Sequence, residues 1–363
     1  MSTFFVRPVF RVMVLLGLAG LSGVVHGAEI QAEVRSRAQM TPADTGVIQA
    51  YVDENAAGLT GEIRAAQQAR DRLLEPAAAK VSVAFRLGYS EALAGKLAGL
   101  YGHADDRVAF NAIRIAGELA SPVTLDGVRA GLGDSRASVR YGAALAARTA
   151  FQHAANRNAA LTDTQTSDLV GMLTRALTSE ADPAGVEGMI AAMDAAPQSA
   201  RLGALQALAG AVSQQARTFG RAGRGGDPAA WAGAFQRAVK TVQSSLLEQM
   251  RVGKPDEGFA KASAELCGAL LGHAKRRAEA GQGEVSEAEW NALGALAADA
   301  EGALIFTHLA LTGQQQAEQT VKAAWEARDA GRISREIDRW IGAGGMLTKT
   351  PYSMSVEKFQ AAK

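Results

Sequence analysis

Apolar side chains recur at helical spacing along most of the chain, and the stretch 134–150 shows this pattern in its narrowest form. Asp134 is a typical N-cap residue, and it precedes a single stripe of small side chains at Val139, Ala143, Ala146 and Ala147. Small residues at these steps allow a second helix to approach closely. We therefore predict a helix over 134–150 that packs tightly against a neighbouring helix.

A related pattern recurs along the chain at intervals of about 30 residues, a spacing at which internal repeats are expected. Val108 lies one period before Val139, Val170 lies one period after it, and Ala200 lies two periods after it. Between these copies we predict shorter connecting helices at 90–101, 124–132, 151–161 and 183–196. Four helix pairs would then cover about residues 90–215.

The order of residues in 134–150 resembles the second helix of a HEAT repeat, with Asp134 followed by Val139-Arg140 and then by alanines. Arg201 matches this arginine two periods later, whereas Ala109 and Gly171 stand at that place in the other copies. The resemblance implies an α-solenoid of short HEAT-like helix pairs, because a single pair buries its apolar face only against the next pair. An ordinary alanine-rich helical bundle is the alternative, since its helices also carry alanine at this spacing.

The residues before the repeats give weaker signals. Thr41 is predicted to cap a helix that has Pro42 at its first position, and a charged helix is predicted over 63–74, ended by Pro76. Residues 80–87 alternate as a strand would, but an isolated strand would leave its backbone groups unpaired, so helix is predicted here too. The whole HEAT-like region is assigned to residues 28–215.

A stretch rich in glycine and arginine follows at 216–227, and we interpret it as a linker. Beyond it, Asp227 caps a helix with an unbroken apolar stripe, and a later helix begins with a capping box formed by Ser286 and Glu289. These helices are longer than those of the repeats. We predict a C-terminal helical bundle over 228–341 that caps the end of the solenoid, with residues 342–363 as a tail.

Composition agrees with an all-α chain, because alanine makes up about a fifth of the 363 residues and aromatic residues only 6%. The formal charge is +1, and Arg7 and Arg11 lie in a segment that we expect to be removed. The remaining chain has 36 basic and 37 acidic residues. A net charge of −1 gives no general attraction to nucleic acid or to an anionic membrane, so neither is predicted as a partner.

Residues 1–27 have the features of a secretory signal peptide. Arg7 and Arg11 precede an apolar run at 12–25, which ends in small residues near Gly27. The run has about 14 residues, whereas a membrane-spanning helix needs about 20. We predict cleavage near Gly27, a periplasmic or secreted protein, and no stable membrane insertion afterwards. An uncleaved membrane anchor is the alternative.

Residues with catalytic or metal-binding chemistry are scattered, so we predict no catalytic residue, no cofactor and no metal site. Cys267 is the single cysteine and lies in an apolar stripe, where it is expected to be buried and inert. The histidines show no His-x-x-x-His spacing, which argues against zinc. Ser355 and Lys358 have the spacing of a Ser-x-x-Lys dyad but lack its companion motifs.

One weak site is predicted in the linker, where Arg217, Arg221 and Arg224 could contact an anion beside glycine backbone N–H groups. The function predicted overall is that of an exported, non-enzymatic scaffold that binds an unidentified protein partner. The alternative is an exported helical enzyme acting on a cell-wall or polysaccharide substrate. A cleft that gathers two carboxyl groups, or a carboxyl group and a histidine, from different helices would favour the enzyme.

Overall fold

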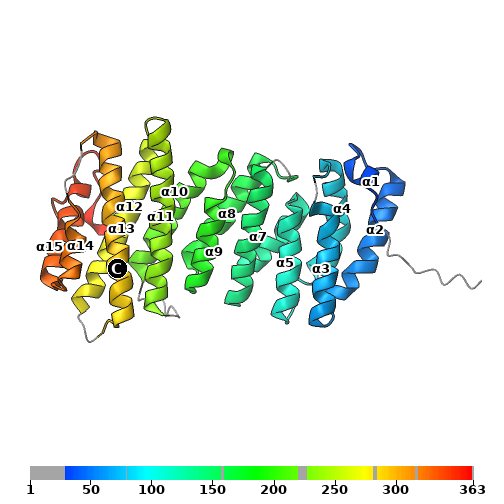
Figure 1. Ribbon diagram of the computed structural model, residues 1–363, viewed down its shortest axis with the longest axis horizontal. Coiled ribbons are helices and arrows are strands. Elements are labelled where there is room, and N and C mark those ends of the chain that lie inside the picture. Colours follow the sequence, from blue (N-terminus) through cyan, green and yellow to red (C-terminus); the bar gives the residue numbers. More distant parts are fainter. Residues whose placement is uncertain are drawn as a thin grey trace, which may run out of the picture.

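A computed structural model describes residues 29–78, 80–156, 159–219, 227–280, 284–314 and 318–361. Every regular element in these residues is helical, so the prediction of an all-α chain is confirmed. The helices follow one another in chain order along the longest axis of the molecule (Figure 1).

The first half of the chain contains ten α-helices and two short 3₁₀ helices in the residues described. They are α1 (Ala32–Ser36), α2 (Pro42–Ala56), η1 (Ala57–Thr60), α3 (Ile63–Ala78), α4 (Val83–Ala98), α5 (Asp106–Leu119), η2 (Pro122–Thr124), α6 (Leu125–Leu132), α7 (Ala137–Ala155), α8 (Asp163–Ser179), α9 (Pro183–Asp194) and α10 (Gln198–Thr218). The second half continues with α11 (Pro228–Val252), α12 (Glu257–Ala280), α13 (Glu287–Thr312), α14 (Thr320–Glu326), α15 (Ala330–Ile341), η3 (Met346–Thr348) and η4 (Val356–Lys358).

These helices form two rows that run side by side. In the odd row, α3, α5, α7, α9, α11 and α13 each contact the next member. The other row is called the even row, although it ends with α15. Its members also each contact the next one, in the order α2, α4, the η2–α6 pair, α8, α10, α12 and α15. Because the chain alternates between the rows, buried side chains between them make one apolar cluster that extends from Ile30 to Phe359.

The small stripe on α7 is buried as predicted, with Val139, Ala143, Ala146 and Ala147 all inaccessible to solvent or nearly so. Glycines on the neighbouring helices make the close approach possible. A Cβ atom at Gly117 of α5 would lie only 2.5 Å from the carbonyl oxygen of Ala146. Neighbouring helices of the odd row therefore touch through backbone as well as side chains.

Several predicted element boundaries are wrong. Asp134 does not cap α7, because that helix begins at Ala137 and the Asp134 carboxylate accepts from the backbone N–H of Arg136, at 2.8 Å. The connecting helix predicted over 151–161 is not a separate element, since residues 151–155 belong to α7 and residues 159–161 are not helical. Pro76 does not end α3, which runs on to Ala78.

Other local predictions are confirmed. Thr41 caps α2 with a complete capping box to Asp44, and Asp227 caps α11 with Pro228 at its first position. The region 80–87 is helical from Val83 onward, with Ser82 as its cap. Ser286 accepts from the Glu289 backbone as expected, but the Glu289 carboxylate pairs with Arg277 instead of completing the box.

The helices before and after the predicted linker at 216–227 pack against each other. Helix α10 continues to Thr218 and lies along α12, and Arg276 of α12 donates to the Ala216 carbonyl at 2.9 Å. Phe219 follows and packs edge-on against Trp231 of α11, with ring centroids 5.5 Å apart. The helices on both sides of 220–226 therefore share a single core, and they do not pack as two separate bodies.

The segment predicted as a tail, 342–363, is packed against the rest of the chain in its described part, 342–361. Leu347 and Phe359 are fully or almost fully buried, and both side chains lie against Gly268 of α12. Lys358 donates to the Glu265 carboxylate at 2.6 Å, so it belongs to an ion pair and not to a Ser-x-x-Lys dyad. We call residues 346–361 the C-terminal strap.

A candidate docking groove on the odd row

The residues singled out from the sequence do not converge on one place. Arg217 lies in the last turn of α10, 3.9 Å from the Glu265 carboxylate, whereas Arg221 and Arg224 lie outside the described residues. Cys267 is buried as predicted, and burial raises the pKa of its thiol to about 12, which leaves it protonated and unreactive near neutral pH. The predicted anion contact at Arg217, Arg221 and Arg224 therefore stays a prediction.

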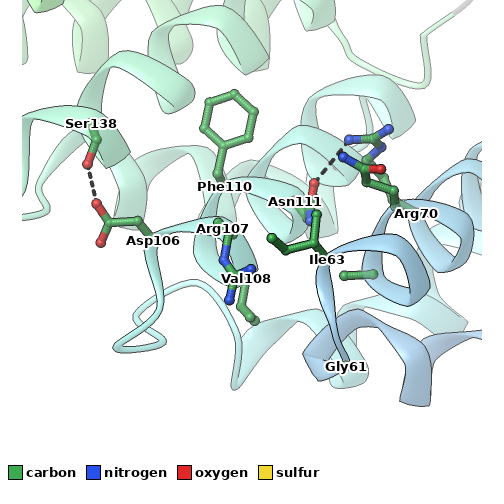
Figure 2. A pocket seen from close by; sticks show the side chains of 11 residues that line it. Gly61, Ile63, Arg70, Asp106, Arg107, Val108, Phe110, Asn111 and Ser138 are labelled. Atoms are coloured by element: carbon green, nitrogen blue, oxygen red, sulfur yellow. Dashed lines mark hydrogen bonds between the residues drawn. The ribbon is translucent and has the colours of Figure 1, made fainter.

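The odd row instead carries a hollow of about 280 Å³ between α3 and α5. Its lining includes the apolar side chains of Ile63, at the start of α3, Val108 and Phe110, together with polar side chains such as Arg70, Asp106 and Asn111 (Figure 2). Ile63 remains 55% exposed although it is a large aliphatic side chain. Arg70 lies at the edge and donates to the side-chain oxygen of Asn111 at 3.3 Å.

A second hollow, of about 380 Å³, lies between α5 and α7 and shares Phe110 with the first. The Phe110 ring packs on Gly142 of α7, where a Cβ atom would overlap the ring, so the glycine makes room for the aromatic side chain. Polar side chains line this second hollow, among them Arg114, Glu118, Arg148 and Gln152. We call the two adjoining hollows the α5 groove.

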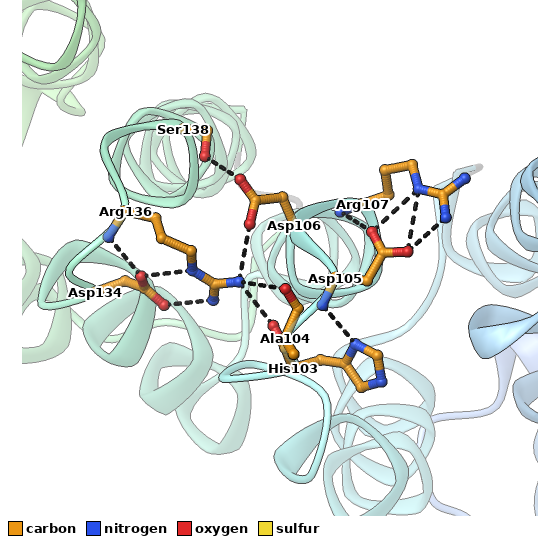
Figure 3. A network of polar contacts seen from close by, with 8 residues as sticks. All are labelled: His103, Ala104, Asp105, Asp106, Arg107, Asp134, Arg136 and Ser138. Carbon is orange, nitrogen blue, oxygen red and sulfur yellow. Dashed lines mark hydrogen bonds and ion pairs between the residues drawn. The ribbon is translucent and has the colours of Figure 1, made fainter.

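One end of the groove is held by a polar network (Figure 3). Arg136 binds both oxygens of Asp134, donates to Asp106 at 2.9 Å, and donates to the His103 carbonyl at 2.8 Å. Ser138 donates to the other oxygen of Asp106. The hydrogen bonds from Arg136 hold the pKa of Asp134 below its usual value. The network joins the loop before α5 to the start of α7 and thereby fixes the groove's edge.

Beside the network, Asp105 caps α5 and binds Arg107. Hydrogen bonds from Arg107 lower the pKa of Asp105 to about 2, so this carboxylate is ionised at any physiological pH. The pair is exposed, and its strength is reduced by solvent. Asp105 and Asp106 therefore form the start of α5, and each carboxylate is already bound by an arginine.

A carboxyl group and a histidine do meet at the second hollow, from different helices. Glu118 of α5 lies 3.0 Å from the Nε2 atom of His153 of α7. The hydrogen bond from His153 lowers the pKa of Glu118, so the carboxyl group stays ionised near neutral pH. A general acid for glycoside cleavage requires the opposite shift, together with a second carboxyl group about 5–9.5 Å away.

Arg114 and Arg148 have a different character from the other charges of the groove. Both are exposed, and neither forms an ion pair with any residue that the structure describes. They project from neighbouring helices into the same hollow. The end of the groove between α5 and α7 therefore has cationic groups available to a ligand.

Sequence reasoning did not identify this groove. A signal was present, since Phe110 and Tyr141 occupy the same place in adjacent copies of the repeat and both are aromatic. Tyr141 is 39% exposed, which a core position would not allow. The pattern of apolar residues does not show this on its own, because the sequence does not say which side of a helix a neighbouring helix covers.

In the described part of the chain, no group of three or more His, Cys, Asp or Glu side chains is placed to hold a metal ion. Within the same residues, α13 alone is long and apolar enough to cross a membrane. It packs between α11 and α12, and 56% of its most apolar 18-residue stretch is buried. Comparison of the sequence with protein-family models and with curated proteins gives no match.

Proposed function

We propose that this protein is an exported, non-enzymatic scaffold, built as an α-solenoid of HEAT-like helix pairs that is capped by the helices after α10. The two rows of helices, each packed mainly on its predecessor and successor, support a solenoid because a compact bundle would bring distant helices into contact.

The arginines that match in the repeat alignment support the HEAT-like assignment. Arg140 donates to the Asp134 carbonyl at 3.0 Å, and Arg201, two periods later, donates to the Asp194 carbonyl at 2.5 Å. Each arginine therefore reaches back to the carbonyl of an aspartate that precedes its own helix, Asp134 in the turn before α7 and Asp194 at the end of α9. A similar role for the matching arginine is expected of repeats and not of unrelated helices.

The observation that carries the scaffold function is the α5 groove. It exposes Ile63 and part of Phe110, while its carboxylates are already bound by arginine or histidine. A partly apolar lining whose carboxylates are already paired suits the binding of a polypeptide better than bond cleavage. Export is proposed from the features of residues 1–27, which lie outside the described residues.

Photo-crosslinking tests the scaffold function. A benzoylphenylalanine introduced at Gln67, which lines the first hollow, should give a discrete crosslinked product in cells that express the full-length chain. The same residue at Arg175, exposed on α8 of the even row, is the matched control and should give none. Crosslinking at neither position, or equally at both, would contradict a docking function for the groove.

The enzyme acting on a cell-wall or polysaccharide substrate remains the second candidate, because Glu118 and His153 are a carboxyl group and a histidine from different helices. Glu118→Gln and His153→Ala should abolish hydrolysis of purified cell-wall material if the chain is such an enzyme. We expect no hydrolysis by the unaltered chain. Measurable hydrolysis by the unaltered chain that is lost in the Glu118→Gln variant would support the enzyme and contradict the scaffold.

A further inference from the structure

The first hollow of the α5 groove offers an apolar contact with nearly balanced charge. Arg70 binds Asp71, and Arg107 binds Asp105, while Glu62 adds a negative charge near Arg107. The exposed part of Ile63 and the ring of Phe110 are therefore the main surface that a ligand would cover here. A bulky apolar side chain matches this hollow because its burial removes both surfaces from water.

The second hollow, between α5 and α7, is basic. Arg114 and Arg148 lack an ion pair among the described residues, and Glu118 is already engaged by His153. Arg114 acts on Glu118 only through space, so a ligand with carboxylates above this hollow would give both guanidinium groups charge-assisted hydrogen bonds that they lack among the described residues. The groove is therefore apolar at one end and basic at the other.

The spacing of the two ends indicates the form of the ligand. The two hollows meet at Phe110 and lie on opposite sides of α5, one toward α3 and one toward α7, and neighbouring packed helices lie about 8–10 Å apart. An extended polypeptide advances about 3.3 Å per residue, so about three residues bridge the hollows. The exposed amide side chains of Gln67 and Gln152 lie one in each hollow, where they could donate to or accept from a peptide backbone.

From these three features we infer that the α5 groove binds an extended acidic polypeptide segment. A bulky apolar side chain of the segment fills the hollow between α3 and α5, and one or two carboxylates about three residues away bind Arg114 and Arg148. The inference rests on the proposed scaffold function and specifies the partner's chemistry. Inorganic phosphate or an anionic bilayer would use the arginines but would leave Ile63 exposed, because neither places a single apolar group in a recess.

Selection from a library of random peptides displayed on phage tests this inference, with the purified full-length chain as bait. Enriched peptides should carry a large apolar residue and at least one Asp or Glu two to four positions away. Their synthetic forms should bind more weakly as salt rises, as expected for charge pairing at a surface. Failure to enrich any peptide, or enrichment without acidic residues, would overturn the inference.

Variants locate the binding. The double variant Arg114→Glu/Arg148→Glu and the single variant Ile63→Asp should each weaken peptide binding at least tenfold. Arg175→Glu/Arg237→Glu makes the same charge change at exposed arginines without an ion pair in the described chain, and Leu202→Asp makes the same apolar change on α10. These controls should bind as the unaltered chain does. Equal losses in variants and controls would overturn the inference, and circular dichroism confirms that each variant is folded.

Two further arms separate the sources of negative charge and the two proposals. Binding of phosphatidylglycerol vesicles that depends on Arg114 and Arg148 but not on Ile63 would show that the groove binds a membrane surface, and it would overturn the peptide inference. Crosslinking at Gln67 in cells, combined with selected peptides that lack acidic residues, would leave the scaffold standing and remove the acidic partner. Acidic peptides that bind in the groove without any crosslink in cells would support the peptide specificity and contradict the scaffold function.

Discussion

At the scale of single residues, buried ion pairs in this protein join one helix pair to the next. Arg140 of α7 binds both oxygens of Glu180, at 2.6 and 2.8 Å, and the Glu180 side chain has no exposure to solvent. The same carboxylate accepts from the backbone N–H groups of Ala181 and Asp182, in the turn before α9. One buried carboxylate thus fixes the connection between three helices.

Arg140→Ala should lower the free energy of unfolding by about 3 kcal/mol, because it leaves the Glu180 carboxylate buried without its cation. Urea denaturation of this variant, of Glu180→Gln and of the double variant completes a mutant cycle. We expect the double variant to lose clearly less than the sum of the two single losses. Additive losses would mean that the two side chains are not coupled.

Ala143 is the residue at which the close packing of helices is best tested. It is fully buried, and a Cβ atom at Gly131 of α6 would lie 2.8 Å from the Ala143 methyl group. Ala143→Leu should therefore destabilise the fold by about 1–3 kcal/mol through overpacking, measured by thermal unfolding. Ala130→Leu on the exposed face of α6 should change stability by less than about 0.5 kcal/mol, and a similar loss in both would refute the close contact.

At the scale of elements, the C-terminal strap is part of the core. Phe359 is buried against α12, and the backbone approaches so closely that a Cβ atom at Gly272 would overlap the Phe359 carbonyl oxygen. Arg276 donates to that same carbonyl at 3.1 Å. The strap therefore covers a face of α12 that would otherwise be open at the end of the even row.

Phe359→Ala should destabilise the chain by about 3–5 kcal/mol, because it removes a buried aromatic ring and leaves a cavity on α12. The change is measured as a shift in the urea midpoint. Val252→Ala, at a side chain that is 87% exposed, is the control and should have little effect. A segment that behaved as a free tail would tolerate both changes equally well.

At the scale of the whole molecule, the helices before and after residues 220–226 pack continuously with one another. Trypsin should cleave early at Arg217, Arg221 or Arg224, since the glycines among them carry a large ordering entropy. The nicked fragments should nevertheless stay together, because α10 packs along α12 and α9 contacts α11. Size-exclusion chromatography should show one peak at the mass of the intact chain. Two separately eluting helical fragments would restore the division into two domains.

The start of the mature chain is also a property of the whole molecule. If residues 1–27 are a signal peptide, intact-mass spectrometry of the exported protein should show a chain that begins at Ala28 or Glu29. Recovery of Met1, or of peptides from Phe4 to Arg11, in the purified protein would contradict cleavage. A chain retained in the membrane fraction with Met1 intact would instead support the uncleaved anchor.

Local sequence determined much of the secondary structure of this protein. The all-α class, the caps at Thr41 and Asp227 and the burial of the α7 stripe and of Cys267 follow from spacing and side-chain chemistry within a few residues. The same local rules misplaced the start of α7, because Asp134 suits a cap by its side chain alone, and only the Arg136 network sets where the helix begins.

Tertiary structure alone decided the rest. Whether Ile63, Phe110 and Arg114 face the core or solvent depends on which helices lie beside α3 and α5, and those contacts join helices about 30 residues apart, beyond the reach of a local pattern. Residues 342–363 were predicted to be a tail, yet Leu347 and Phe359 pack against Gly268 of α12. Periodicity indicates only that a helix has a buried face. Which other element covers that face depends on the arrangement of the two rows that has the lowest free energy.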